Sequence, residues 1–302
     1  MLCMSAFNDR PGLFSYAGEL RRELSLRNQH YAQCLQLLNH ESYGDPPSIC
    51  YLPSEDGMCH GNFLRESYCA ILRNPSWRKR LLKAHTQARS ALPREDRAWK
   101  ELDSCNSSDA LLMNIFCFPG TLRGRRVVDL LGVEAGFVPE FGFKARVPLA
   151  SGRADRTEVD MRLGELLVES KLTESDFQCS EVALVESYRD FADVFECRKL
   201  PQDARGFLSY QLIRNVLAAH HGHCSFCVML DARRPDLREA WFAVMSCIRM
   251  VDLRLRCKVL TWQELAEPLP GKLQRFLLEK YGIAAGKNAG TALRDELFAA
   301  NV

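Results

Sequence analysis

The feature that most constrains this chain is a pair of short extended stretches, residues 156–162 and 165–171, separated by a tight turn at Leu163 and Gly164. Side chains alternate between the two faces of a β-strand, so residues two apart share a face. An apolar run, Leu166, Leu167 and Val168, lies just before the charged end of the second stretch and marks it as a core strand. We therefore expect a hairpin in the core that carries charged groups at one end.

The alternation brings acidic groups of the two strands to one face. A two-residue turn places Asp160 opposite Leu167 and Glu158 opposite Glu169, and Lys171 lies on the same face as Glu169. Carboxylates that face one another on a sheet repel at a cost of about 0.2 to 1 kcal/mol when exposed, and more when buried. A divalent hard cation relieves this repulsion, and Mg²⁺ needs only one or two protein carboxylates besides water and substrate phosphate.

This combination suits phosphodiester hydrolysis. A bound Mg²⁺, or Mn²⁺ in its place, polarises a phosphoryl oxygen and lowers the pKa of water, and Lys171 can orient that water and offset charge in the transition state. A plainer alternative is that Glu169 and Lys171 form an exposed ion pair at a strand end, with Asp160 an unrelated carboxylate near a turn.

The surrounding pattern predicts a protein of alternating helices and strands. The first hundred residues are mainly helical, with helices over 17–40 and 76–91, the latter capped by Ser76, around a turn-rich loop at 42–61. The elements expected afterwards are a helix capped by Ser107 and Ser108, a short helix over 122–131, three antiparallel strands over 137–147, 156–162 and 165–171, helices over 181–196 and 204–220, a strand over 225–230, a helix over 237–249, a strand over 257–260, a helix from Trp262 capped by Thr261, and a final helix over 273–281.

With these motifs in place, the chain resembles the PD-(D/E)XK nuclease superfamily, the restriction-endonuclease-like fold, in a prokaryotic branch. Residues 156–160 and 167–174 resemble its motifs II and III, while 107–116 and 210–215 resemble the helices before and after them. The likeness spans about 101–267, although Glu158 and Val159 stand before Asp160 where the family name has a proline. It implies an α/β fold with a central mixed sheet flanked by helices. The chain then divides into a helical N-terminal extension (1–100), a nuclease-like core (101–268) and a C-terminal helix and tail (269–302).

The resemblance also implies roles for individual residues. Many members carry a further carboxylate on the first helix, for which Asp109 or Glu101 is available, although Asp109 can equally serve the helix N-terminus. Gln211 and Arg214 lie one helical turn apart and can reach the site or a phosphate, or be ordinary polar residues of a helix surface. The predicted catalytic residues are Asp160, Glu169, Lys171 and Gln211; the metal ligands Asp160, Glu169, Asp109 and Glu158; and the nucleic-acid contacts Ser107, Ser108, Arg214 and Asn215.

The formal net charge of +2 is too small to indicate nucleic-acid binding by itself, so any binding face must come from local clusters. Three basic clusters are candidates for holding phosphates, or are solvated helix faces: Arg73, Arg78, Lys79, Arg80 and Lys83; Arg123, Arg125 and Arg126; Arg233, Arg234 and Arg238. Four tryptophans can stack on unpaired bases or belong to the core: Trp77, Trp99, Trp241 and Trp262.

Zinc is the competing metal. Two groups contain zinc-type ligands, namely His220, His221, His223, Cys224 and Cys227, and Cys50, Cys59, His60 and Cys69. Neither has the spacing of a standard zinc site, and the three-residue spacing sends Cys224 and Cys227 to opposite faces of a strand. We expect free thiols in a reducing compartment for the 13 cysteines.

No apolar run approaches the roughly 18 to 20 residues of a membrane span, and the first ten residues do not resemble a secretory signal, so the expected location is the cytoplasm. The expected partner is DNA, less so RNA, with a homodimer allowed and no membrane. The sequence therefore predicts a Mg²⁺-dependent DNA nuclease. The alternative is a non-catalytic nucleic-acid-binding or assembly protein of the same fold.

Overall fold

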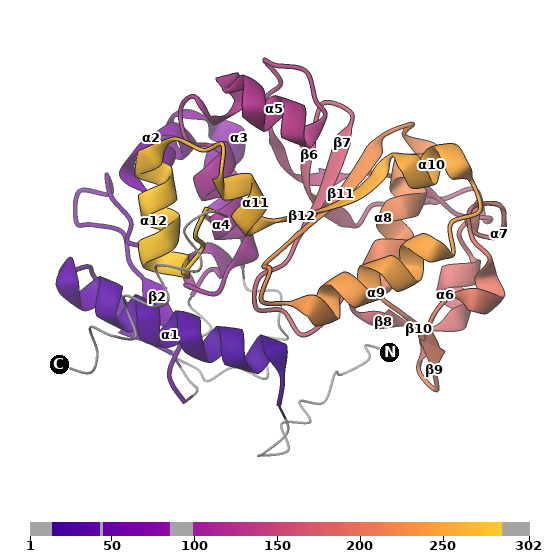
Figure 1. Cartoon of the computed structure of the whole chain (residues 1–302), viewed down its shortest axis with the longest axis horizontal. Helices are drawn as coiled ribbons and strands as arrows, with labels where there is room; N and C mark the ends of the chain where they lie inside the picture. Colours follow the sequence, from indigo (N-terminus) through magenta and orange to yellow (C-terminus); the bar gives the residue numbers. More distant parts are fainter. Residues whose placement is uncertain (1–13, 43–44, 85–98, 286–302) are drawn as a thin grey trace.

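The computed structural model describes residues 14–42, 45–84 and 99–285. A five-stranded mixed sheet forms its centre, in the order β12-β11-β7-β6-β3 (Figure 1). Strands β3 (Glu140–Lys144), β6 (Glu158–Leu163) and β7 (Leu166–Ser170) are antiparallel, whereas β11 (Ser225–Leu230) pairs in parallel with both β7 and β12 (Cys257–Thr261). The predicted mixed α/β fold and its antiparallel meander are confirmed.

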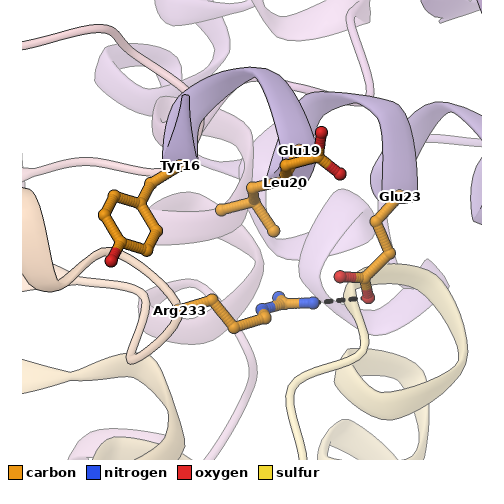
Figure 2. A pocket seen from close by; sticks show the side chains of 5 residues that line it. All are labelled: Tyr16, Glu19, Leu20, Glu23 and Arg233. Atoms are coloured by element: carbon orange, nitrogen blue, oxygen red, sulfur yellow. Dashed lines mark hydrogen bonds and ion pairs between the residues drawn. The ribbon is translucent and has the colours of Figure 1, made fainter. Parts of the chain in front are cut away.

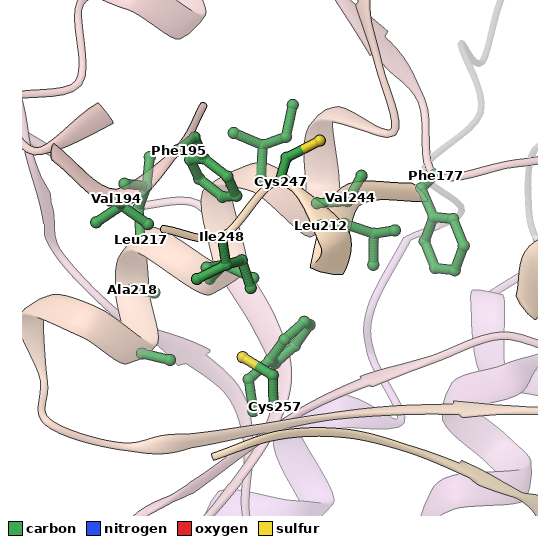
Figure 3. Packing of buried hydrophobic residues seen from close by; sticks show 14 of the residues in the cluster. Phe177, Val194, Phe195, Leu212, Leu217, Ala218, Val244, Cys247, Ile248 and Cys257 are labelled. Atoms are coloured by element: carbon green, nitrogen blue, oxygen red, sulfur yellow. The ribbon is translucent and has the colours of Figure 1, made fainter. Parts of the chain in front are cut away.

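Helices cover both faces of this sheet (Figure 1). On one face lie α4 (Ser108–Phe116), α5 (Arg125–Leu131), α11 (Trp262–Ala266) and α12 (Gly271–Tyr281), whose apolar side chains pack with Met161, Val168 and Met229. On the other lie α8 (Tyr210–His221) and α9 (Pro235–Ser246), and Figure 3 shows Leu212 and Leu217 of α8 in that core. Two cores separated by the sheet therefore hold the hairpin β6–β7 from both sides.

The predicted helix caps near the sheet are confirmed. Ser107 Oγ accepts a hydrogen bond from the Ala110 amide at 3.1 Å at the start of α4. At the start of α11, Thr261 and Glu264 form a reciprocal capping box. These caps satisfy amides that the first helical turn leaves unpaired, which is why short polar residues mark helix starts in the sequence.

The N-terminal part contains helices and one hairpin. Its elements are α1 (Tyr16–Cys34), β1 (Asn39–Glu41), β2 (Ile49–Tyr51), α2 (Arg65–Arg73) and α3 (Pro75–Arg80). The hairpin β1–β2 lies within segments predicted as helix and loop, because Ile49, Cys50 and Tyr51 are buried there. The cap of α3 is Asn74, not Ser76: Asn74 Oδ1 accepts from the amides of Ser76 and Trp77 at 3.0 and 3.3 Å. Residues 85–91 of the predicted helix lie outside the described residues.

Helix α1 makes polar contacts with distant parts of the chain. Asn28 donates to the carbonyl oxygen of Lys280 at 3.0 Å, and Lys280 Nζ, in a fully buried side chain, donates to Asn28 Oδ1 at 2.6 Å beneath the Tyr51 ring. Further along, Arg233 Nη1 lies 2.5 Å from Glu23 Oε1, and Figure 2 shows this pair beside a small pocket on α1. The N-terminal helix is thus held by buried polar contacts as well as by packing.

Two predicted helices are shorter than expected. Residues 181–196 form two short helices, α6 (Val182–Glu186) and α7 (Phe191–Val194), and residues 204–220 begin with strand rather than helix. Gly206 accounts for the strand at the start of the second segment. Its φ of +127° is a backbone conformation that favours glycine, and a Cβ at this position would lie 2.1 Å from the Ser180 carbonyl oxygen. It lies in β10 (Gly206–Leu208), between β8 (Cys179–Ser180) and β9 (Gln202–Asp203).

The remaining elements are short. They are β4 (Val147–Pro148), β5 (Ala154–Asp155), α10 (Val251–Leu255) and the 3₁₀ turns η3 (Glu101–Asp103), η4 (Thr121–Arg123) and η5 (Cys197–Lys199).

Candidate functional site

The register of the β6–β7 hairpin differs from the predicted one by two residues. Leu163 pairs with Leu166, so the turn consists of Gly164 and Glu165, and the same register continued places Asp160 opposite Glu169. Leu163 stays in the strand because it is fully buried, and Gly164 opens the turn with a φ of +58°. A shift of two residues keeps every side chain on its predicted face. The observed register therefore places Asp160 opposite Glu169, whereas the predicted register had placed it opposite Leu167.

Glu169 and Lys171 form a buried ion pair at the end of β7. Lys171 Nζ lies 2.6 Å from Glu169 Oε1, and the two residues are 5% and 1% exposed. The other carboxylate oxygen, Glu169 Oε2, accepts from Asn215 Nδ2 of α8 at 2.7 Å. Burial excludes the alternative of an exposed strand-end ion pair, and hydrogen bonds to both oxygens fix the carboxylate in one orientation.

Asp160 lies beside this pair, and its carboxyl group has a raised pKa. Its Oδ2 accepts hydrogen bonds from the amide and the hydroxyl of Ser170 at 2.7 and 2.9 Å. Burial, and then the carboxylates of Glu169 and Asp109, raise the pKa of Asp160 to about 8, against the opposing effect of Lys171. The Asp160 carboxyl group is therefore harder to ionise than a solvent-exposed aspartate, because burial penalises its charged form and the neighbouring carboxylates repel it.

Asp109 and Glu158 are held by two cations from the N-terminal part. Asp109 is 4% exposed, and its Oδ2 accepts from Arg80 Nη2 at 2.7 Å and from Lys83 Nζ at 2.8 Å. Arg80 also reaches Glu158 Oε2 at 2.9 Å, and Lys83 reaches Glu101 Oε1 at 2.9 Å. Both acids weighed for the first-helix position, Asp109 and Glu101, therefore take part in one network.

The four predicted nucleic-acid contacts are buried and already have partners. Ser107 caps α4, and Ser108 Oγ lies 2.5 Å from Glu174 Oε1. Arg214 is 3% exposed and donates to Asn215 Oδ1 at 2.8 Å and to the Glu158 carbonyl at 2.9 Å. In this arrangement Arg214 orients Asn215, which in turn orients Glu169.

Gln211 behaves differently from these residues. It lies in the first turn of α8, and its Oε1 is buried without a hydrogen-bond partner among the described residues. It stands one helical turn before Asn215, the partner of Glu169. A buried acceptor without a partner is costly unless water or a ligand satisfies it.

Three residues near the site were not predicted for it. Arg80 and Lys83 were assigned only to a basic cluster, because nothing local links them to an acid more than 20 residues away. Glu174 binds Ser108 through one oxygen and the Leu172 amide through the other, at 2.6 Å, and so ties β7 to α4. Its position three residues after Lys171, within motif III, was the available signal.

The oxygen donors fit a hard divalent cation, although the acids are not gathered around a point. No three His, Cys, Asp or Glu side chains within residues 14–42, 45–84 and 99–285 lie close enough together to hold a metal ion. Amines instead occupy oxygens of Glu169 and Asp109. Two carboxylates suffice for Mg²⁺ when water and phosphate complete its shell, and Asp160 and Glu169 supply two.

The zinc alternatives gain no support from the structure. Cys224 and Cys227 enter different cores on opposite faces of the sheet, and the imidazole of His60 contacts Asp103 Oδ1 at 3.2 Å. None of the twelve cysteines in the described part of the chain takes part in a disulfide.

The other clusters divide between surface and core. Arg234 is fully buried, whereas Arg123, Arg125 and Arg126 are exposed. Trp241 and Trp262 are core residues. Trp77 donates to the Pro139 carbonyl at 2.8 Å, and Trp99 stacks on His40. No helix in the described ranges combines the length and apolar character of a membrane span.

The mixed sheet, its helices and the hairpin with Asp160, Glu169 and Lys171 define a restriction-endonuclease-like protein. Residues 38–282 match the model of the family described as Restriction Endonuclease associating with ARP. The chain belongs to this family, which implies a DNA-cleaving phosphodiester hydrolase. Comparisons with curated proteins and with solved structures gave no significant match.

Proposed function

We propose that this chain hydrolyses DNA phosphodiester bonds with Mg²⁺ or Mn²⁺ at a site formed by Asp160, Glu169 and Lys171. The observation that carries the proposal is the buried Lys171–Glu169 pair beside Asp160, an acid whose pKa is raised by burial and then by neighbouring carboxylates. A purely structural ion pair would not need a second buried carboxylate against it, because that carboxylate destabilises the fold.

The metal would be held by Asp160 and Glu169, with Asp109 within electrostatic reach. When bound, it supplies a Lewis acid and a water of lowered pKa. The chain itself supplies orientation: Asn215 holds one oxygen of Glu169, and Arg214 holds Asn215. Lys171 would supply a positive charge beside Glu169 that offsets the charge of the substrate phosphate, and its ammonium would orient the attacking water.

The other predicted residues take supporting roles in this proposal. Ser107 and Ser108 set the position of the α4 N-terminus, next to which Asp109 lies. The unpartnered oxygen of Gln211 can accept a hydrogen bond from a water at the site. Contacts to DNA phosphates then fall to exposed basic residues, since Arg214 is buried.

The test is cleavage of supercoiled plasmid, linear duplex and RNA with Mg²⁺, Mn²⁺ or EDTA. We expect metal-dependent cutting of DNA by the wild type and a loss of about 10²-fold or more in Asp160→Asn, Glu169→Gln and Lys171→Met. Lys199→Met is the matched control, because Lys199 forms an exposed pair with Glu196 at the same 2.6 Å. It should cut at the wild-type rate.

The rival function, a non-catalytic nucleic-acid-binding or assembly protein, predicts a different result. DNA binding with no metal-dependent cutting, equal in the wild type and the three site variants, would favour it. Cutting that survives in Asp160→Asn and Glu169→Gln would show that the active site lies elsewhere.

A further inference from the structure

Two cations from the N-terminal part of the chain converge on one acid of the nuclease-like core. Arg80, the last residue of α3, and Lys83, three residues further on, both donate to the same oxygen, Asp109 Oδ2, at 2.7 and 2.8 Å. The Asp109 side chain is 5% exposed, against 11% for Arg80 and 21% for Lys83. This contact is thus largely shielded from water, and it joins regions that the sequence separates into extension and core.

Each cation also has a second acid of its own. Arg80 keeps Glu158 through its other guanidinium nitrogen, and Lys83 keeps Glu101. Asp109 is the acid that they share. If Asp109 were taken by another positive charge, Arg80 and Lys83 would each still have a carboxylate partner, so neither would be left buried and unpaired. The network can therefore release Asp109 without leaving an uncompensated charge.

The charges also match those of a divalent ion. Arg80 and Lys83 together carry two positive charges, the same as one Mg²⁺, and they face the group of carboxylates that includes Asp109, which is near enough to Asp160 to affect its ionisation. Two buried positive charges beside a divalent cation repel it. The Asp109 oxygen that such an ion would need is taken by the guanidinium of Arg80 and the ammonium of Lys83.

We propose that Arg80 and Lys83 act as a built-in counterion for the acids Asp109, Asp160 and Glu169. A divalent metal would have to displace these two cations from Asp109 before Asp109 could contribute to its binding. This inference rests on the proposed nuclease function and adds that the N-terminal segment sets the metal affinity of the site. Arg80 and Lys83 are positioning residues in this account, because they act through Asp109.

The measurement is metal affinity without DNA and without turnover. Titration calorimetry with Mn²⁺ is carried out on the full chain as wild type, Lys83→Met, Lys83→Arg and Lys79→Met. Lys79 is the matched control, an exposed lysine of α3 that lies four residues before Lys83. We expect the Kd for Mn²⁺ to fall at least about tenfold in Lys83→Met, and to stay near the wild-type value in Lys83→Arg and Lys79→Met.

A second measurement needs only the wild type and so does not depend on a variant folding. Hydrogen exchange followed by mass spectrometry reports on the amides of residues 78–84, where Lys83 donates its amide to the Arg80 carbonyl and accepts from the Glu101 amide. Saturating Mg²⁺ should speed exchange in this segment if the cations leave Asp109.

The outcomes separate this inference from the nuclease proposal. Unchanged or weaker Mn²⁺ binding in Lys83→Met, or exchange over 78–84 that Mg²⁺ leaves unaltered, would overturn the counterion role while leaving metal-dependent cleavage intact. A wild-type chain that binds neither Mn²⁺ nor Mg²⁺ would overturn both.

Discussion

Replacing Lys171 by methionine tests how strongly burial changes the contribution of an ion pair. The chain contains two Lys–Glu pairs with the same separation of 2.6 Å, one buried and one exposed. Lys171 and Glu169 have side chains 6% and 2% exposed, whereas Lys199 and Glu196 have side chains 69% and 45% exposed. Methionine keeps most of the lysine stem and removes the charge, so the two variants differ mainly in their surroundings.

The expected magnitudes follow from this difference. At equal distance, the attraction is about four times stronger at an effective dielectric constant of about 20 than in water. Lys171→Met leaves the Glu169 carboxylate buried beside Asp160, with only Asn215 still donating to it. Breaking a buried pair in this way costs about 3 to 5 kcal/mol of unfolding free energy. Lys199→Met should cost less than about 1 kcal/mol.

The assay is urea unfolding at neutral pH in EDTA, with the free energy extrapolated linearly to water. The double variant Lys171→Met with Glu169→Gln should lose less stability than the two single variants added together, because no unpaired charge remains. Mg²⁺ should stabilise Lys171→Met more than it stabilises the wild type, since the metal then meets less opposing charge.

Equal losses in Lys171→Met and Lys199→Met would refute this reasoning. The pair would then be solvated, and the environment assigned to Glu169 would be wrong.

Three further changes probe the supports of the site. Arg234→Lys should lower the free energy of unfolding in urea by about 2 kcal/mol or more. The fully buried guanidinium donates to three carbonyls in the segment after β7, and lysine cannot reach them all. A loss below about 0.5 kcal/mol, the size of ordinary surface changes, would contradict this prediction. Gly206→Ala should lower the free energy of unfolding by about 2 kcal/mol or more, because the φ of Gly206 is +127° and the new Cβ would lie 2.1 Å from a carbonyl oxygen. Gly152→Ala is the control: its φ is +79° and the new Cβ would lie in open space, so the loss should be clearly smaller. Burial holds the pKa of Lys280 well below its usual range, so between its folded and unfolded pKa values the unfolded chain binds more protons and stability rises with pH, by up to about 1.4 kcal/mol per unit. From about pH 7 to 8, below the ordinary pKa of the Cys105 thiol of about 8.5, the unfolding free energy should rise more steeply with pH in the wild type than in Lys280→Met. Asp160, whose pKa is raised to about 8, contributes the same opposing slope to both chains, so equal slopes would argue against the prediction.

Local patterns in the sequence were sufficient to predict the hairpin and the face that its charged residues share. Alternation over β6 and β7 fixed the face on which Asp160, Glu169 and Lys171 lie, because a period of two is a property of the strand itself. Ser107 and Thr261 marked helix starts for an equally local reason, since a cap satisfies amides two or three residues away. The order of these elements, together with the resemblance to the PD-(D/E)XK superfamily, predicted the mixed sheet.

The hairpin register needed the packed structure. Both a turn at Leu163–Gly164 and one at Gly164–Glu165 satisfy the alternation, and the burial of Leu163 decides between them.

Only the tertiary structure decided which partners complete the site. Asn215 reaches Glu169 across 46 residues, and Arg80 and Lys83 reach Asp109 across 29 and 26. Such contacts depend on how α8, α3 and α4 are placed around the sheet, and no periodicity within one element encodes that placement. The sequence by itself therefore determined which acids and amine share a face. Packing determined which charges neutralise them, because a buried charge takes the partner that the fold brings within reach.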